Sequence, residues 1–462
     1  MVIERLKNLT GSNRRSFLKW SAAAGALLGL ERSELLNYLS DSTGSAMADA
    51  ASCSATNRSV HIIAGDGGFA WFQLLWPHTA IATSMNNNFA YHAFGQGGMA
   101  AESDKPLYLG PQAPWGEYGK TKLVTGFMAG QNQTHTPTPG SAAVVGNNQS
   151  MMAVVSAIQR ATPSLLPVIA VNPLNFGGAP GAPNPTTVAN ADGLVQLFNS
   201  AASRAILSVP EDAALFEAYY KAFVGLNRAA ARPTQFKGLR IGKQSANFLG
   251  KNLAAQLQPT QDDLDRYGIV GNTPNKLQEI AKILITAVRA FKLGLTQSVI
   301  LPAMRDDPHG AFGDMTNLNM TVTSLGKILG EFMNDCNATP DPSCSSRNLS
   351  DSIVLTVHGD TPKDPRDKSG WPDGTPNNSN WIYAMGNGFI KTGWFGGVNA
   401  DGSTDGYDPT TGNKVANQQS NTNSAAAGAA IAYAVAKGDM RRVEDFYTGP
   451  AIDGLVNLNP LQ

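Results

Sequence analysis

The chain lacks an excess of charge of either sign, and it has few charged residues of any kind. Lysine plus arginine and aspartate plus glutamate number 35 each among 462 residues, and together they make up only 15% of the chain. A balanced chain presents no net field to a polyanion, so we expect no nucleic-acid partner. Hydrophobic residues make up 42%, which argues against disorder throughout and allows a sizeable buried core.

A long apolar run is missing from the first fifty residues, although a short one is present. Residues 20–30 read WSAAAGALLGL, and spanning a bilayer takes about 20 apolar residues, so we expect no stable membrane anchor. The run follows Arg14 and Arg15 in NRRSFLKW, which is the order of parts in a twin-arginine export signal. The sequence therefore predicts export through the twin-arginine translocation machinery, to the periplasm, the cell surface or the medium.

Small residues mark the end of the signal. Ala46 and Ala48 form the A-x-A pattern in SAMADA, which predicts a signal peptide over residues 1–48. The distance from the apolar run is long for a signal peptide, so the cleavage position stays open. Proteins that use this pathway cross the membrane already folded, often with a cofactor in place, and a metal loaded in the cytoplasm is compatible with this route.

Cysteine is scarce, with three residues in the whole chain. Cys336 and Cys344 bracket the turn-rich segment NATPDPS, and in an oxidising compartment this spacing predicts a local disulfide. The alternative is two free thiols. Cys53 lies near the start of the mature chain, and AASC is a poor lipoprotein site because the apolar run is far upstream.

Signature motifs of several enzyme classes are absent. No G-x-S-x-G elbow indicates a serine hydrolase, and no P-loop or Rossmann glycine pattern opens a helix. The apolar runs are short, rich in β-branched residues and separated by long helical or irregular stretches, which predicts an α/β fold. Near-continuous apolar strands are covered on both faces, so the central sheet should be mostly parallel, with helices on either side.

Six strands and three helices are predicted from these patterns. The strands are expected at residues 59–66, 122–128, 166–171, 297–303, 352–359 and 380–386, and the helices at 211–227, 275–292 and 317–335. We interpret residues 56–462 as one α/β domain with a helical insertion at about 172–296. The segment GGAPGAPNP within it equally fits a linker, but no second series of strands and helices begins behind it.

Three of the predicted strands end in groups that bind metals. The strand at 59–66 ends in AGDGG, the strand at 297–303 runs into RDDPHG, and the strand at 352–359 ends in VHGD. Ligands of open parallel sheets bind beyond the carboxyl ends of the strands, so each of these ends is a candidate site. The predicted metal ligands are Asp66, Asp307, His309, His358 and Asp360, with Asp306 as a further candidate.

The mixture of carboxylates and imidazoles suits a divalent cation such as zinc, with calcium and manganese as alternatives. Taken singly, an aspartate after a strand is most often a turn residue or a helix cap. A single histidine is most often a core or surface residue. The coincidence of three such strand ends favours the metal-site interpretation.

The loop after the strand at 122–128 supplies hydroxyl groups. Thr134 and Ser141 are the candidate nucleophiles, and His135 lies between them in the same loop. Two metal ions at such a site can polarise a phosphoryl or sulfuryl oxygen and activate a hydroxyl nucleophile. His61 lies inside a predicted strand and is interpreted as a packed residue.

The order of these segments resembles that of a known group of proteins. A twin-arginine signal is followed by HIIAGDGGFAWFQLLWP, a histidine-containing polar loop, ILPAMRDDPHG before a long helix, IVLTVHGDTPKD and NWIYAMGNGFIKTGWFGG. This order is similar to that of an uncharacterised family of exported twin-arginine-signal proteins placed in the alkaline phosphatase and sulfatase superfamily. The resemblance extends from about residue 59 to residue 402, with the helical insertion matched loosely. It implies an alkaline phosphatase-like fold and a metal-dependent hydrolase.

Three short motifs carry the resemblance most directly. Residues 65–68 are similar to the family's GG-x-D-G strand end, residues 305–309 to its W-D-x-H, and residues 359–362 to its G-R-T-P turn. These motifs are the ones that hold the predicted metal ligands. The resemblance and the strand ends therefore point to the same residues.

Two departures from the family pattern concern the same site. Val357 and His358 stand where the family has an acidic residue ahead of the G-R-T-P turn. Asn378 and Asn380, in PNNSNW, stand where an Asp-His pair is expected, so a two-metal site would lose at least one ligand there. His358 and Asp360 would compensate for the loss, or the site would hold one metal, or none.

Two hypotheses about function follow. The first is an exported metal-dependent hydrolase of phosphate or sulfate esters, with a small-molecule or polymeric ester as substrate. The alternative is a degenerate, non-catalytic member of the same fold that acts as an exported binding or surface protein. The segment PNNSNW and the asparagine-rich loops, which suit contacts with carbohydrate or protein, favour the alternative.

Overall fold

The structure is a computed structural model of the chain. It describes residues 53–54, 56–63, 98–99, 108–109, 124–128, 144–162, 164–172, 176–199, 253–303, 315–358, 381–391, 393–398, 404–416 and 420–458. Backbone contacts divide the chain into two units, one of residues 1–52 and 192–258 and one of residues 53–191 and 259–462. The central sheet belongs to the second unit.

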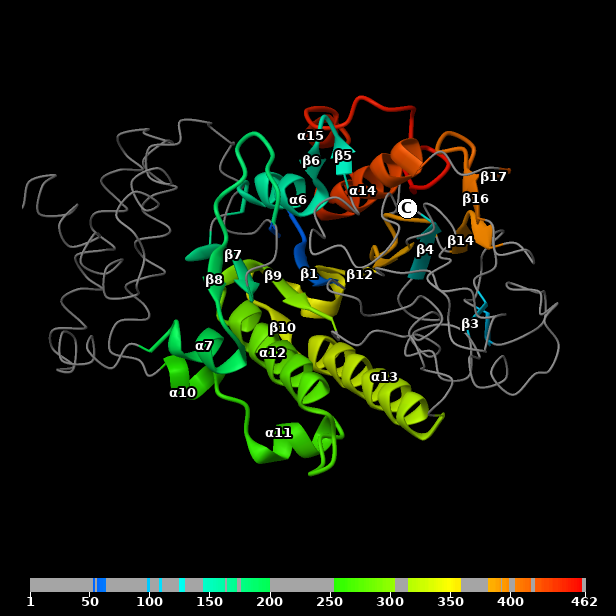
Figure 1. The fold of residues 1–462 in the computed structure, drawn as a ribbon. Coiled ribbons are helices and arrows are strands. Elements are labelled where there is room, and N and C mark those ends of the chain that lie inside the picture. Colours follow the sequence, from blue (N-terminus) through cyan, green and yellow to red (C-terminus); the bar gives the residue numbers. More distant parts are fainter. Residues whose placement is uncertain are drawn as a thin grey trace, which may run out of the picture. The chain divides into compact units, whose positions relative to one another are not determined.

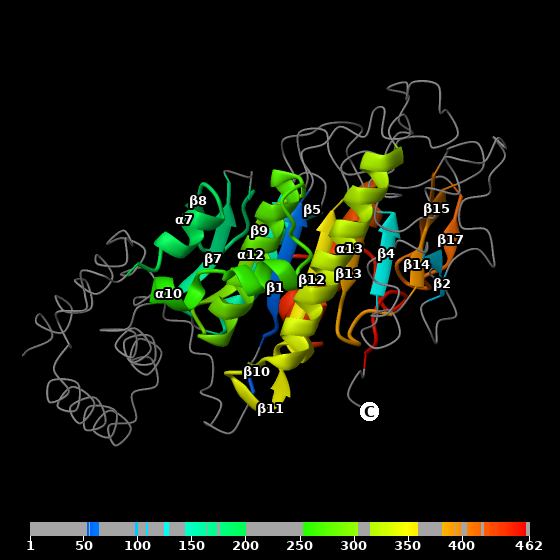
Figure 2. The ribbon, with the colours of Figure 1, turned by 90° about the horizontal axis from the view of Figure 1, so that it is seen from below.

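The second unit is built on an eight-stranded sheet in the order β14-β4-β13-β12-β1-β9-β7-β8 (Figure 2). The strands are β1 (Arg58–Ile63), β4 (Val124–Met128), β7 (Leu166–Val171), β8 (Thr186–Val188), β9 (Thr296–Pro302), β12 (Ile353–His358), β13 (Trp381–Met385) and β14 (Gly393–Phe395). β13 pairs antiparallel with both of its neighbours, and the other pairs are parallel. The prediction of a mostly parallel sheet is confirmed.

The central strands form because their side chains are apolar and both of their faces are covered. β1 and β12 are buried at every position, and β9 is buried at all positions except Pro302. The six predicted strands are all present, with small shifts at their ends. β8, with the sequence TTV, and β14, with the sequence GWF, were not predicted, because three residues are too short to show a period of two.

Helices cover both faces of this sheet. α12 (Asn275–Lys292) and α13 (Met315–Ala338) lie on one face, and α6 (Met151–Gln159) and α14 (Ser420–Val435) lie on the other (Figure 1). The predicted helix at 275–292 is confirmed, and α13 contains the predicted helix at 317–335. The predicted helix at 211–227 lies outside the described residues.

The sequence of α12 explains why it forms where it does. Pro274 precedes its first residue, where a missing backbone N–H removes no helical hydrogen bond. Leu277, Leu284 and Phe291 recur at helical spacing and are fully buried, so one stripe of the helix faces the core. Lys292 ends the helix with a positive charge near the negative end of the helix dipole.

The remaining elements are short. They are β2 (Gly98–Met99), β3 (Tyr108–Leu109), β5 (Val144–Gly146), β6 (Gln149–Ser150), α7 (Ala191–Gln196), α10 (Leu253–Leu257), α11 (Gln261–Arg266), β10 (Pro340–Asp341), β11 (Cys344–Asn348), η5 (Leu349–Asp351), β15 (Gly397–Val398), β16 (Thr404–Tyr407), β17 (Lys414–Val415) and α15 (Arg441–Glu444). The insertion predicted at about 172–296 includes β8 and α12, which both belong to the sheet unit.

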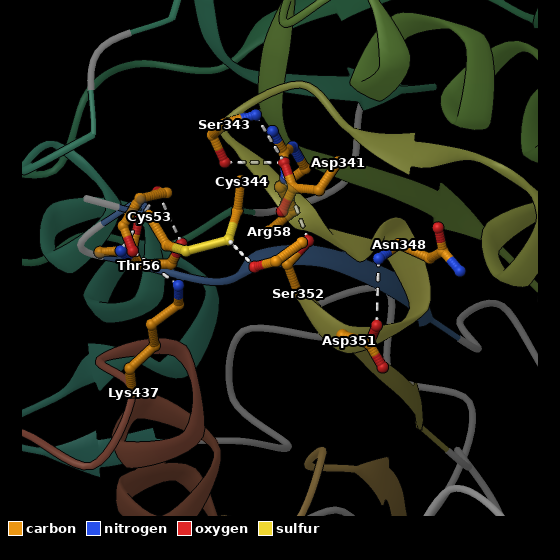
Figure 3. Close-up of a disulfide and its surroundings, with 12 residues drawn as sticks. Cys53, Thr56, Arg58, Asp341, Ser343, Cys344, Asn348, Asp351, Ser352 and Lys437 are labelled. Carbon is orange, nitrogen blue, oxygen red and sulfur yellow. Dashed lines mark hydrogen bonds and ion pairs between the residues drawn. A yellow bond between two sulfur atoms is a disulfide. The ribbon is translucent and has the colours of Figure 1, made fainter. Parts of the chain in front are cut away.

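A disulfide joins Cys53 to Cys344, with 4.6 Å between their Cα atoms (Figure 3). The predicted pairing of Cys336 with Cys344 is therefore wrong. The thiol of Cys336 is fully buried in the last turn of α13, whereas Cys344 begins β11 beside the segment that leads into β1. The bridge closes a sequence separation of 291 residues, a distance at which the sequence carries no sign of the pairing.

A buried ion pair lies next to the disulfide (Figure 3). Arg58, the first residue of β1, donates from Nη1 to Asp341 Oδ1 at 3.0 Å and to Ser352 Oγ at 3.1 Å. The amide and the hydroxyl of Ser343 also donate to Asp341 Oδ1, at 2.8 and 2.7 Å. Burial acts to raise the pKa of Asp341, but the charge of Arg58 and the serine hydrogen bonds outweigh burial and lower it. The pair holds β10 against the start of β1.

Candidate functional site

Three parallel strands end together at one edge of the sheet, which we call the carboxyl edge. β12, β1 and β9 are neighbours, and the register pairs Ile63 with His358 on one side and with Pro302 on the other. Open parallel sheets bind their ligands at this edge. The segments that carry the predicted metal ligands follow these three strands in the chain, so the strand ends that such a site needs are adjacent.

Two further strands meet the carboxyl edge. β13 runs antiparallel between β12 and β4, and the register pairs Ile382 with His358 and Trp381 with Met128. β13 therefore begins, and β4 ends, at the edge where β12 ends. The loop that carries the candidate nucleophiles follows β4, and PNNSNW leads into β13.

Most of the predicted site residues lie outside the described residues. These are Asp66, Thr134, His135, Ser141, Asp306, Asp307, His309, Asp360, Asn378 and Asn380. His358 is described, as the last residue of β12, and only 2% of its surface is exposed. The roles of all these residues in a metal site stay predictions.

His358 is one of three buried polar residues in hydrogen-bond contact, which we call the buried trio. Thr356 Oγ1 lies 2.9 Å from Nε2 of His358 and 2.7 Å from Nδ1 of His61. Thr356 and His358 are two residues apart in β12 and so share one face of the sheet, and the register places His61 beside Thr356. The trio therefore leads from the interior of β1 to the carboxyl edge.

Both imidazoles of the trio are neutral at neutral pH. Burial lowers the pKa of His358 to about 3. Burial, with a smaller contribution from the nearby His358, also lowers the pKa of His61 to about 3. A neutral imidazole has one donor and one acceptor nitrogen.

One nitrogen of each ring is left over. Among the described residues, His61 Nε2 and His358 Nδ1 are buried and have no hydrogen-bond partner. Burying such an atom without a partner costs stability, so an orphaned nitrogen at the end of a strand calls for an explanation. Because His358 Nε2 already contacts Thr356, its Nδ1 is the atom that remains for a ligand at the carboxyl edge.

The position of His61 inside an apolar strand predicts that it is packed, and the residue is indeed fully buried. Its hydrogen bond to Thr356 is missed, because the two residues are 295 positions apart. Thr356 carries no signal of its own, since threonine is common in strands. A search for polar residues two apart at a strand end would have found Thr356 and His358, but not their partner.

A complete metal site is not formed by the described residues alone. Within the described ranges, no three or more histidine, cysteine, aspartate or glutamate side chains lie close enough to hold a metal ion. A metal at the carboxyl edge would need ligands from the segments that follow the strands. The orphaned Nδ1 of His358 fits such a site, because a neutral imidazole nitrogen is a common metal ligand.

Acid is expected to destabilise the fold through the two histidines. Their pKa values are about 3 in the fold and 6.5 ordinarily, so the unfolded chain binds more protons between these values. The free energy of unfolding should therefore fall as the pH is lowered, by about 1 kcal/mol for each imidazole between pH 6 and pH 5. Urea unfolding at a series of pH values measures this slope. Substituting His61→Gln should reduce it, and an unchanged slope would contradict the assignment.

Comparison with known proteins identifies the first segment of the chain. Residues 11–30 match the family model of the TAT (twin-arginine translocation) pathway signal sequence. The protein is exported by that pathway. The translocation machinery is accordingly a partner, as the sequence predicts. No curated protein matches the chain, and no solved structure matches it. None of the described helices is long and apolar enough to cross a membrane.

Proposed function

We propose that the protein is an exported metal-dependent hydrolase of phosphate or sulfate esters, with a fold of the alkaline phosphatase and sulfatase type. The observation that carries this proposal is the position of His358. It ends β12 at the carboxyl edge, its Nε2 contacts Thr356, and its Nδ1 is buried without a partner among the described residues. Such an atom is suited to bind a metal at the edge where strands β1 and β9 also end.

The remaining parts of the proposed site come from the segments beyond the strands. Asp66 follows β1, Asp307 and His309 follow β9, and Asp360 follows His358. These four side chains are the proposed partners of His358 as ligands. A divalent ion held there would polarise a phosphoryl or sulfuryl oxygen and promote attack by a hydroxyl.

The chain's own residues would have three tasks in this reaction. Carboxylates and imidazoles at the strand ends would coordinate the cation, and the carboxylates would balance its positive charge. A hydroxyl of Thr134 or Ser141, in the loop after β4, would attack the ester. The apolar body of the sheet beneath the edge would exclude water from the ligands, which strengthens every electrostatic interaction among them.

A second candidate function rests on one feature of the sequence. PNNSNW leads into β13 at the carboxyl edge, and it places Asn378 and Asn380 where related proteins would have an aspartate and a histidine. Amide groups are poorer zinc ligands than carboxylate or imidazole. A chain that keeps the fold without a complete metal site would serve as an exported binding or surface protein.

Metal content and ester hydrolysis distinguish the two functions. Protein purified from the exported fraction without chelators should contain at least one equivalent of zinc, calcium or manganese and should hydrolyse aryl phosphates or aryl sulfates. Asp307→Asn should weaken metal binding by at least about 10-fold. Mutating a residue that only hydrogen-bonds to a metal ligand already lowers metal affinity by about that factor, and Asp307 is proposed as a ligand itself. Elemental analysis and equilibrium dialysis measure both quantities.

The matched control is Asp262→Asn, which makes the same chemical change at an exposed position of α11. Its metal content and activity should equal those of the unaltered protein. Less than one equivalent of metal, together with no hydrolysis of either ester, would reject the hydrolase and leave the binding protein as the supported function.

A further inference from the structure

We propose that Thr356 and His61 are positioning residues that hold His358 with its proton on Nε2 and with Nδ1 as a free acceptor at the carboxyl edge. The use of that nitrogen as a ligand rests on the proposed function, whereas the tautomer does not. The geometry is the buried trio, in which Thr356 Oγ1 lies 2.7 Å from His61 Nδ1 and 2.9 Å from His358 Nε2.

The hydroxyl of Thr356 limits the arrangements of protons in the trio. A hydroxyl has one hydrogen to donate and two lone pairs to accept with. If both facing nitrogens carried protons, the hydroxyl hydrogen would have no acceptor in the trio. If neither did, one nitrogen would face the oxygen without a hydrogen between them. The hydroxyl therefore accepts from one imidazole and donates to the other, because only then does each of its two contacts contain one hydrogen.

Two arrangements of the hydrogens meet this condition, and in each of them the two rings have the same tautomer. In the first, His358 Nε2–H donates to Thr356 Oγ1, whose hydroxyl donates to His61 Nδ1. In the second, His61 Nδ1–H donates to Oγ1, and the hydroxyl donates to His358 Nε2. The first places both rings in the Nε2–H tautomer and the second places both in the Nδ1–H tautomer. The Nε2–H form is the commoner one of a neutral histidine, so the first arrangement is favoured.

The first arrangement leaves two buried nitrogens without a partner among the described residues. One is His358 Nδ1, which keeps an unshared lone pair, and the other is His61 Nε2, which keeps its hydrogen. An unpartnered acceptor next to the strand end is what a cation needs. Because a ligand at Nδ1 requires the proton on Nε2, binding there and the hydrogen bond to Thr356 support one another.

His61 influences the tautomer of His358 indirectly, through the Thr356 hydroxyl. Thr356 can accept from His358 without orphaning its own hydrogen only because His61 Nδ1 accepts that hydrogen. His61 is fully buried, and its ring meets that of His358 edge to face with 6.3 Å between the ring centroids, while its hydrogen bond reaches His358 through the Thr356 hydroxyl. The trio thus links a residue in the sheet interior to the carboxyl edge.

The experiment compares three proteins that differ at one hydroxyl. Thr356→Val keeps the shape of the side chain and removes the hydroxyl, whereas Thr356→Ser keeps the hydroxyl. Nitrogen-15 spectra of the metal-free, histidine-labelled full chain report which ring nitrogen of His358 carries the proton. We expect Nε2–H in the unaltered protein and in Thr356→Ser, and a mixture of tautomers in Thr356→Val. Zinc affinity should be lower in Thr356→Val than in Thr356→Ser by about 10–100-fold.

Thr286→Val is the control for loss of a buried threonine hydroxyl. Thr286 lies in α12 and donates to the carbonyl of Lys282 at 2.8 Å, so its substitution should leave the His358 tautomer and the zinc affinity unchanged. An Nδ1–H tautomer in the unaltered protein would overturn the proposal, even if Thr356→Val does not fold. So would equal tautomers and equal affinities in Thr356→Val and Thr356→Ser. An Nε2–H tautomer that depends on the Thr356 hydroxyl, in a protein that binds neither zinc, calcium nor manganese and hydrolyses neither ester, would support the positioning role and reject the proposed function.

Discussion

Replacing Asp341 with asparagine is expected to lower the free energy of unfolding by about 3–5 kcal/mol, because a charged group is left buried without its counter-ion. The side chains of Arg58 and Asp341 are only 3% and 1% exposed, and 3.0 Å separates Nη1 from Oδ1. Asparagine keeps the shape of the side chain and one acceptor oxygen, so the loss reports the charge. Chemical unfolding in urea measures it.

A double-mutant cycle separates the charge from the packing. Arg58→Met removes the guanidinium and keeps an unbranched side chain in its place. The double variant Arg58→Met with Asp341→Asn should lose less stability than the two single variants together, because neither charge then remains buried alone. Additive losses would indicate that the two side chains contribute separately and not as an ion pair.

An exposed ion pair provides the matched control. Asp439 accepts from Arg441 Nε at 2.8 Å, and 86% of the Arg441 side chain is exposed. Water and salt screen such a pair, so Asp439→Asn should change stability little. A loss for Asp341→Asn no larger than that for Asp439→Asn would contradict the role given to the buried pair.

The fold was predictable where a single strand or helix carries its own signal. Strands such as β7 and β12 are apolar runs bounded by polar loops, and α12 shows a regular apolar stripe. The antiparallel direction of β13 was not predictable, because the hydrophobic pattern of a strand is the same in a parallel and in an antiparallel pair. The order β12-β1-β9 was not predictable either, since it brings together strands that lie far apart in the chain.

The position of His358 at the end of a strand was predicted from the apolar run before it, whereas its role as a ligand stays a prediction. Its connection to His61 through Thr356 depends on the register between β1 and β12, which no local pattern encodes. The cysteines show the same limit, since the short spacing between Cys336 and Cys344 suggested a local bridge. The actual partner, Cys53, is 291 residues from Cys344.

The disulfide itself should contribute strongly to stability after export. Cys53→Ser is expected to lower the free energy of unfolding by about 2–5 kcal/mol, toward the upper end because the bridge closes a very long loop. Disulfides form in oxidising compartments and not in the cytoplasm. Because the twin-arginine pathway carries folded proteins, the fold must form before the bridge does.

Contacts other than the bridge hold the two cysteines in place before oxidation. Arg58, at the start of β1, bonds to Asp341 in β10, which pairs with the strand that Cys344 begins. Lys437 donates from Nζ to the carbonyl of Ser54 at 2.6 Å, beside Cys53. Reduced protein should therefore remain folded, at lower stability, and Cys53→Ser should still be exported.

Reductant provides the control that distinguishes the two cysteine pairings. The unaltered protein should lose stability on reduction by the same amount that Cys53→Ser loses, and Cys53→Ser should not respond to reductant at all. Cys336→Ala should keep the full response, because the buried thiol of α13 takes no part in the bridge. If Cys336→Ala abolished the response and Cys53→Ser kept it, the local pairing suggested by the sequence would be correct. The start of β1 would then be held by the Arg58–Asp341 ion pair without a covalent link.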